Sequence, residues 1–226
     1  MTEMIYVAST WVLPVLLAIT LHEAAHGFAA ACLGDDTAKR MGRVSINPLR
    51  HVDILGTVVL PLALLLFRAP FLFGWAKPVP VNFAALNHPK RDMVLVAAAG
   101  PMANFAMALS AAILIHLALY ISGATGIWLL ENLRNAMVIN LVLAVFNLIP
   151  LPPLDGGRIA VGLLPRPLAL RFARLEKWGL FIIVGMLFIL PLIGAQLGAK
   201  INVFAWLVGV PVTFLYDLLL HVAGVV

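Results

Sequence analysis

The sequence predicts an all-α polytopic membrane protein that forms a single integral membrane domain over residues 1–226. Hydrophobic residues make up 63% of the chain and charged residues only 11%, whereas soluble domains are about 45–50% apolar and about 25% charged. Mean hydropathy is correspondingly high, at +1.04. No polar stretch is long enough to fold as a separate soluble domain. The single cysteine, Cys32, excludes an intramolecular disulfide and a zinc site built from several thiolates.

Five apolar segments are predicted to cross the membrane as helices, because each approaches the roughly 20 residues that a hydrocarbon core of about 30 Å requires. They cover about residues 4–33, 94–121, 127–150, 178–197 and 201–222. The first segment is preceded by the acidic Glu3 and by no basic residue, so we expect it to be retained rather than cleaved as a signal peptide. The last two segments are expected to form a C-terminal helical hairpin over about 176–224.

Two shorter stretches between the first two spans are predicted not to cross. Residues 54–67 form an uncharged run that is interrupted by Gly56 and Pro61, and a run of this length is more often re-entrant or interfacial than spanning. Residues 43–48 alternate in polarity beside turn-forming residues, which predicts a short extended, β-like stretch.

The distribution of basic residues decides between two topologies. If 54–67 does not span and the N-terminus lies outside, the loops at 34–53, 74–92 and 155–177 all lie inside and hold twelve of the fifteen Lys and Arg residues. If 54–67 does span, the inside loops hold only six. Basic residues gather on the cytoplasmic side of membrane proteins, so the first topology is favoured, with an outside N-terminus in the plasma membrane. The net charge of +5 then needs no nucleic-acid partner.

The first span contains His22, Glu23 and His26. Histidines four residues apart lie on one face of a helix, so their ring nitrogens can converge on one metal ion such as Zn²⁺. A glutamate beside the first ligand can reach a water on that metal. The alternative is that these side chains lie near the bilayer surface and snorkel into water. Ionisable residues inside membrane spans are costly and mark function, which favours the metal site.

Asp155 is the best candidate for the third ligand that a catalytic zinc site requires. It follows the prolines that end the third span and precedes Gly156 and Gly157, which let the backbone turn sharply. In the favoured topology Asp155 and the two histidines lie at the same inner side of the membrane, whereas the other topology separates them by most of the bilayer. The alternative is a loop aspartate in water. The remaining histidines lack partners at ligand spacing and are expected to be structural or interfacial: His51, His88, His116 and His221.

The paired motifs at 22–26 and 147–156 resemble the signature of the site-2 proteases. These are zinc metalloproteases that cut the membrane segments of other proteins. The stretches between the motifs resemble the compact prokaryotic branch, which lacks PDZ and CBS domains, and the resemblance covers about residues 20–160. It implies a catalytic core over about 4–158.

The resemblance also implies a role for each motif residue and one zinc ion per chain. The zinc ligands would be His22, His26 and Asp155, the general base Glu23, and the substrate-binding residues Asn104 and Asn147, of which Asn147 would also assist catalysis. The implied reaction is hydrolysis of peptide bonds in or near transmembrane segments on the cytoplasmic side. A substrate helix must unwind for this, and we hypothesise that residues 43–48 offer an edge to the unwound strand.

Two other classes of function compete with a protease. A zinc transporter or receptor would distribute ionisable residues across the bilayer, whereas here they cluster toward one face, with Asp217 as the main exception. The other alternative is a structural membrane scaffold whose motifs are accidental. The expected partners are a transmembrane protein or peptide substrate and the lipid bilayer, not nucleic acid, and a homo-oligomer is left open.

Overall fold

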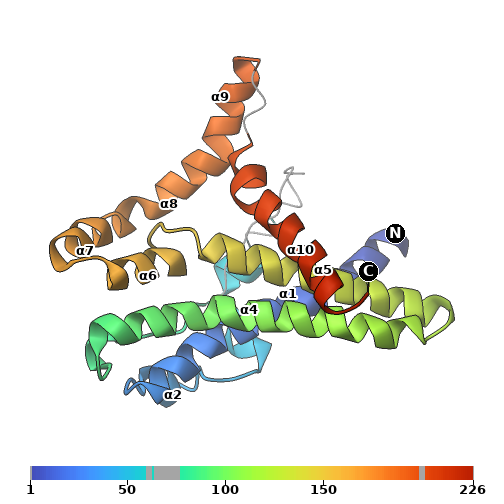
Figure 1. The fold of residues 1–226 in the computed structure, drawn as a ribbon, viewed down its shortest axis with the longest axis horizontal. Coiled ribbons are helices and arrows are strands. Elements are labelled where there is room, and N and C mark those ends of the chain that lie inside the picture. Colours follow the sequence, from blue (N-terminus) through green and yellow to red (C-terminus); the bar gives the residue numbers. More distant parts are fainter. Residues whose placement is uncertain (1, 60–62, 64–76, 199–201, 226) are drawn as a thin grey trace.

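The computed structural model describes residues 2–59, 63, 77–198 and 202–225, and the regular structure in these ranges is helical throughout (Figure 1). Five helices are long and apolar enough to cross a membrane, which confirms the predicted all-α polytopic fold. Two of the five contain short π-helical stretches. The spans are α1 (Thr2–Cys32), α4 (Pro89–Leu119), α5 (Gly123–Asn147), α8–η4–α9 (Glu176–Val184, Gly185–Ile189, Leu190–Gln196) and η5–α10 (Ala205–Gly209, Val210–Val222).

The core of the molecule is a bundle of α1, α4 and α5, which pack against one another in all three pairs. In Figure 1, α4 and α5 run side by side along the long axis and are joined by a short turn. Gly123 lies in that turn with φ +78°, a left-handed conformation that favours glycine. Small buried residues at these interfaces let the helices approach closely: Ala18, Ala30, Ala97, Ala108, Ala111, Ala112, Ala118 and Ala144.

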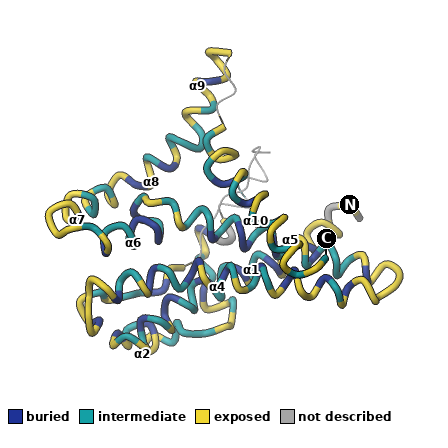
Figure 2. The backbone as a smooth tube through the Cα atoms, viewed as in Figure 1, coloured by how far each residue is buried: buried dark blue, intermediate teal, exposed yellow. Residues whose placement is uncertain are grey.

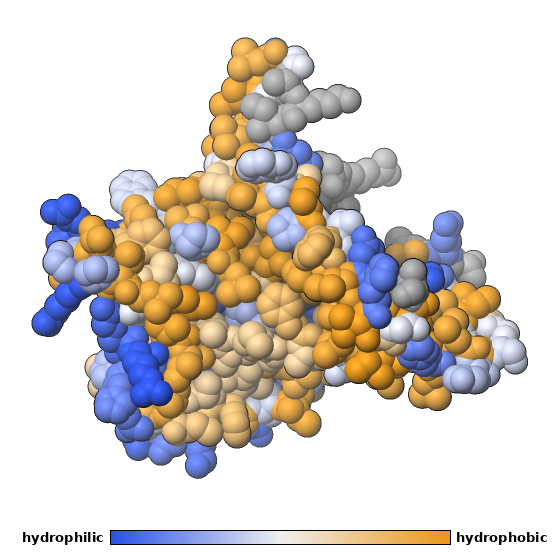
Figure 3. Space-filling model, viewed as in Figure 1, coloured by the Kyte–Doolittle hydropathy of each residue, from blue (hydrophilic) through white to orange (hydrophobic). Residues whose placement is uncertain are grey.

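The C-terminal hairpin packs against this bundle through its second helix. Val208 and Val212 share an apolar cluster with Ala108 and Leu141. The α8–η4–α9 helix leaves the bundle, and its tip is mostly exposed (Figures 1 and 2). Apolar side chains cover much of the surface in Figure 3, as expected for a protein whose outer face meets lipid.

Short elements surround one end of the bundle and bring distant parts of the chain together. Four short elements lie between α1 and α4 in the described part of the chain, and two more lie between α5 and α8: α2 (Thr37–Arg40), η1 (Pro48–Arg50), η2 (Ile54–Val59) and η3 (Phe83–Ala85), then α6 (Asp155–Leu163) and α7 (Arg166–Ala173). Figure 1 places α2, the start of α4, α6 and α7 at the same end of the molecule. This end is where the polar motifs meet.

The region between α1 and α4 differs in part from the sequence prediction. None of the described residues forms a strand, and residues 43–47 are irregular, with bends at Val44 and Ile46, where a β-like stretch was predicted. The reason is that the Arg43 guanidinium donates to the Arg50 carbonyl and the Asn47 side chain caps η1, so the segment folds back on itself. Of the predicted re-entrant segment 54–67, the structure describes the π-helical turn η2 and residue 63, and the rest lies outside the described residues.

The end of α5 is shaped by glycines that permit very close backbone contact. α5 ends at Asn147, and α6 begins at Asp155 after a proline-rich turn. A Cβ added at Gly157 would lie 2.2 Å from the Pro152 nitrogen, and one added at Gly179 would lie 1.7 Å from the Pro152 carbonyl oxygen. The two contacts hold the start of α6 and the middle of α8 against this turn, which directs Asp155 back toward the bundle.

Candidate metal centre

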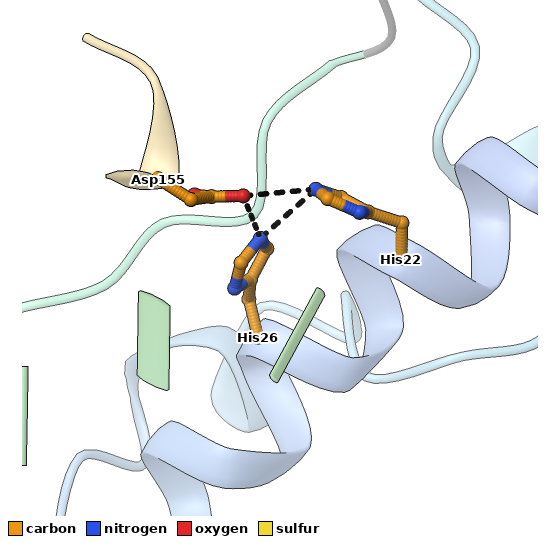
Figure 4. A group of neighbouring side chains, drawn as sticks. All are labelled: His22, His26 and Asp155. Atoms are coloured by element: carbon orange, nitrogen blue, oxygen red, sulfur yellow. Dashed lines mark hydrogen bonds and ion pairs between the residues drawn. The ribbon is translucent and has the colours of Figure 1, made fainter. Parts of the chain in front are cut away.

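The three predicted metal ligands come together in the C-terminal third of α1 (Figure 4). His22 and His26 point from successive turns of α1 toward Asp155, the first residue of α6. The His22 Nε2 and His26 Nε2 atoms are 3.1 Å apart. Asp155 Oδ2 lies 3.2 Å from His22 Nε2 and 3.3 Å from His26 Nε2. All three residues are buried.

These three distances fit a tetrahedral metal ion. Ligand atoms about 2.0–2.1 Å from a tetrahedral Zn²⁺ lie about 3.3 Å from one another. The donor set of two imidazoles and one carboxylate is also the kind that catalytic zinc sites use, with a fourth position left for water. Asp155 Oδ2 is buried and has no ordinary hydrogen-bond partner among the described residues, so a cation would satisfy an otherwise costly buried oxygen.

Both imidazoles are oriented by acceptors on α4. His26 Nδ1 lies 2.7 Å from the Val96 carbonyl oxygen, and His22 Nδ1 lies 2.6 Å from Asn104 Oδ1. A carbonyl oxygen only accepts, so Nδ1 of His26 carries the proton and its Nε2 offers a lone pair toward Asp155. Asn104 is completely buried behind His22. This is the second layer of contacts that typically fixes the ring orientation of metal-binding histidines.

The carboxyl of Asp155 is held as an anion. Burial raises the pKa of the Asp155 carboxyl, but the hydrogen bonds and positive charge of His22 and His26 in their protonated form outweigh burial and lower the pKa to about 2. An anionic oxygen beside two imidazole nitrogens is therefore present at neutral pH, as a divalent cation requires.

Gly100 on α4 makes room for the two imidazole rings. A Cβ at this position would lie 2.4 Å from His26 Nε2 and 2.6 Å from His22 Cε1. Only a residue without a side chain fits here while the rings keep their positions. Gly100 is not among the site residues predicted from the sequence, so its contact with the two rings is a finding of the structure.

A cavity of about 170 Å³ opens beside the three candidate ligands. Glu23, Asn147 and Arg158 contribute to its lining, so the cavity brings together residues of α1, α5 and α6. Asn147 Nδ2 donates to the Leu143 carbonyl, at 3.0 Å, within its own helix. The Arg158 guanidinium lies over the Phe83 ring, 5.3 Å from its centroid.

A segment without regular secondary structure, residues 77–82, forms one wall of this cavity through Pro78, Val79 and Val81. Three of its backbone amides are bound to residues that precede it in the chain. Lys77 N donates to the His51 carbonyl at 2.8 Å, Val79 N to Glu23 Oε2 at 2.7 Å, and Asn82 N to Asp35 Oδ2 at 2.6 Å. We call this segment the strap.

Comparisons with known proteins identify the family of the chain. The model of a family described as Peptidase family M50 matches residues 123–190. YwhC of Bacillus subtilis (strain 168), named as a candidate zinc metalloprotease, is 37% identical over 189 residues, which cover 80% of this chain and 80% of the relative. Rip2 of Mycolicibacterium smegmatis (strain ATCC 700084 / mc(2)155), named in the same way, is 27% identical over 179 residues, or 78% of this chain and 65% of the relative. No solved structure matches the chain.

The match to M50 includes both Asn147 and Asp155, and the similarity to YwhC extends over four fifths of both chains. The chain therefore belongs to peptidase family M50, the site-2 protease family of membrane metallopeptidases.

Proposed function

We propose that this protein hydrolyses peptide bonds in or near the transmembrane segments of other membrane proteins, using one zinc ion per chain and Glu23 as general base. The observation that carries the proposal is the convergence of His22, His26 and Asp155 within 3.3 Å, beside a cavity that Glu23 also lines. When bound, zinc supplies the Lewis acidity that activates water and polarises a peptide carbonyl. The protein's own residues supply the orientation and the proton transfers.

In our proposal Glu23 accepts and returns a proton. Its carboxylate lies at the cavity, and Oε2 accepts the Val79 amide hydrogen bond. A carboxylate has about four acceptor positions, so Glu23 can hold the strap and still accept a hydrogen bond from the attacking water. In the proposed reaction it takes a proton from that water and then gives the proton to the leaving amine.

The two asparagines assigned from the sequence have different surroundings. Asn147 lines the cavity and uses one amide hydrogen within its helix, so its second amide hydrogen can bind a substrate carbonyl. In our proposal Asn147 therefore contacts the substrate. Asn104 is fully buried behind His22, which supports a role in holding that imidazole and leaves substrate binding to residues at the cavity.

A substrate must enter as an unwound chain, because a membrane helix keeps its backbone groups in internal hydrogen bonds. The strap lines the cavity through Pro78, Val79 and Val81. Its two prolines have no N–H group, and the amides of Lys77, Val79 and Asn82 are already bonded, so an unwound substrate would pair mainly with the carbonyl oxygens of the strap. We therefore move the proposed receiving edge from residues 43–48 to residues 77–82, where such pairing would bring the peptide bonds of the substrate beside Glu23.

The proposed orientation puts this end of the molecule on the cytoplasmic side of the plasma membrane. Hydrophilic side chains cover the end formed by α2, the start of α4 and α7 in Figure 3. Twelve of the fifteen Lys and Arg residues belong to the loops expected at this end, which the positive-inside tendency assigns to the cytoplasm.

The test is reconstitution of the purified protein in sealed vesicles with a single-span membrane-protein substrate. We expect cleavage in or near the substrate span, mapped by mass spectrometry of the products, and no zinc flux across the vesicle membrane. Zinc flux without hydrolysis would show that the protein is a zinc transporter and would contradict the proposed protease function. If a His22→Ala variant retained zinc, the proposal that His22 is one of the zinc ligands would be wrong.

A further inference from the structure

A buried asparagine of α5 continues the contacts behind His22. Asn140 is 3% exposed and lies in the apolar middle of α5. Its Oδ1 accepts a hydrogen bond of 2.7 Å from Asn104 Nδ2, and Asn104 in turn contacts His22. The three residues come from three different spans, α5, α4 and α1. We call them the relay.

The direction of every hydrogen bond in the relay is set by backbone carbonyls, which only accept. Asn140 Nδ2 donates to the Ala136 carbonyl at 2.8 Å, so its Oδ1 faces Asn104. The Asn104 amide group therefore donates to Asn140, and it also donates to the Ala18 carbonyl at 3.3 Å. Asn104 Oδ1 is left to face His22, whose Nδ1 must donate to it.

This direction selects one form of the His22 ring. With its proton on Nδ1, neutral His22 keeps the lone pair of Nε2 directed at the position shared with His26 and Asp155. A ring flip would place a C–H there, and the other tautomer would place an N–H there; either would exclude a cation. The Asn140 contact is shorter than the Ala18 contact, at 2.7 Å against 3.3 Å, so Asn140 is the closer of the two acceptors that orient Asn104.

We propose that Asn140 is a positioning residue of the metal centre, which acts through Asn104 to hold the His22 imidazole ready to bind metal. The inference rests on the proposed zinc site and adds a residue that touches neither the ligands nor the cavity. The competing explanation is that Asn104 and Asn140 serve only to join α4 to α5, as polar pairs do between membrane helices. A purely adhesive pair would affect stability and leave the metal affinity of the folded protein unchanged.

Asn132 provides a matched control in the same helix. It is also buried, at 6% exposed, and its Nδ2 donates to the carbonyl four residues earlier, Trp128, at 2.9 Å. Its side chain is not part of the relay. Replacing Asn132 therefore repeats the loss of a buried asparagine and its backbone hydrogen bond in α5 without changing the contacts of His22.

The experiment compares Asn140→Leu with Asn132→Leu in detergent-purified full-length protein. Zinc affinity is measured by chelator competition, and the Co²⁺-loaded proteins are compared by visible absorption, which reports ligand geometry. Loss of a residue that contacts a metal ligand typically lowers metal affinity about 10–100-fold. Asn140 contacts Asn104 and not the ligand itself, so we expect a smaller loss of zinc affinity for Asn140→Leu, about five- to tenfold. The Co²⁺ spectrum of this variant should also change. Asn132→Leu is expected to stay within about twofold of the wild type.

Equal zinc affinity and equal Co²⁺ spectra for the two variants would overturn the positioning role and leave the zinc site in place. A wild-type protein that binds no zinc would instead overturn the proposed function itself. If Asn140→Leu does not fold, Asn140→Ser is measured in its place, because serine is too short to hold the 2.7 Å contact and is better tolerated in a membrane helix. The same loss of affinity is then expected.

Discussion

The Glu23 carboxylate accepts a hydrogen bond from the backbone amide of Val79, at 2.7 Å, although 56 positions separate the two residues in the chain. The bond joins the proposed general base on α1 to the strap that forms the cavity wall. A hydrogen bond from a backbone amide fixes the direction of the carboxylate that accepts it. The strap thus orients the base as well as shaping the place where a substrate would lie.

Removing this amide should slow the reaction without removing the metal. Val79→Pro eliminates the N–H group, so Glu23 loses its fixed orientation while His22, His26 and Asp155 keep their contacts. We expect kcat to fall by about 10- to 100-fold, which is less than the roughly 100- to 10,000-fold that a positioned base contributes in full, because the carboxylate itself remains; the zinc content should be unchanged. Val81→Pro is the control, because the Val81 amide makes no hydrogen bond to Glu23. Equal rates for the two proline variants would show that the Val79 amide has no part in orienting the base.

The space at Gly100 predicts a strong effect of one added methyl group. In Gly100→Ala the Cβ would meet His26 Nε2 at 2.4 Å and His22 Cε1 at 2.6 Å, so both rings must move away from the position they share with Asp155. We expect zinc affinity to fall by at least about tenfold, measured by chelator competition. Gly209→Ala is the control, since its nearest neighbour would be the Ala205 Cβ at 3.9 Å. Unchanged affinity in Gly100→Ala would mean that the rings adopt another arrangement.

Asp35 fixes the far end of the strap and predicts a dependence of stability on pH. It is 1% exposed and accepts hydrogen bonds from the Thr37 hydroxyl, the Thr37 amide and the Asn82 amide. Burial raises the pKa of the Asp35 carboxyl, but the bonds from Thr37 and Asn82 and the nearby Arg40 charge outweigh burial and lower the pKa. A carboxyl whose folded pKa lies below its unfolded value of about 3.9 stabilises the protein above that value. This contribution is lost as the pH falls through the folded pKa.

Asp35→Asn should therefore lower the melting temperature at pH 7, because hydrogen bonds to charged groups contribute about 1.5–3 kcal/mol. The difference from the wild type should shrink as the pH falls below about 4. The neighbouring Asp36→Asn is the control, since Asp36 is exposed and makes no side-chain capping bond, and its melting temperature should follow the wild type at every pH. A difference for Asp35→Asn that stays constant from pH 7 to pH 3 would contradict the ionised contact.

The contact between Gly179 and Pro152 predicts that the C-terminal hairpin supports the metal centre. Gly179→Ala would place a methyl group 1.7 Å from the Pro152 carbonyl oxygen, which forces α8 away from the turn that leads to Asp155. We expect a loss of about 1–3 kcal/mol in stability, as for other overpacked sites, together with weaker zinc binding. Both are measured against Gly185→Ala, whose Cβ would meet nothing within 4 Å. Lower stability with normal zinc affinity would limit the hairpin to a structural role.

Apolar length and charge were enough to predict the five spans, because both follow directly from the cost of placing polar groups in hydrocarbon. The boundaries were less accurate. α4 begins at Pro89, five residues before the predicted start at 94, since a proline at the first helical position begins the helix and a hydropathy pattern omits the charged first turn. The predicted β-like stretch at 43–48 forms no strand, because hydrogen bonds of Arg43 and Asn47 fold the segment back, and the polarity pattern does not reveal these bonds.

The proximity of the candidate ligands was also predictable, because the spacing of His22 and His26 and the breaks around Asp155 are visible in the sequence. The contacts behind them were not. Val79 contacts Glu23 through its backbone amide, which every residue except proline has. The identity of residue 79 therefore gives no sign that it orients the glutamate. Asn140 lies seven residues before Asn147, which places both on one face of α5. That spacing is the one signal that could have indicated a buried polar contact.

The most direct test of the account is the zinc content and the proteolytic rate of Glu23→Gln, measured side by side with the wild type on a reconstituted membrane-protein substrate. A glutamine oxygen can still accept the Val79 hydrogen bond but cannot take a proton from water. We predict that Glu23→Gln binds one zinc ion per chain, as the wild type does, and cleaves at least about a hundredfold more slowly. A Glu23→Gln protein that cleaves at the wild-type rate would contradict the account.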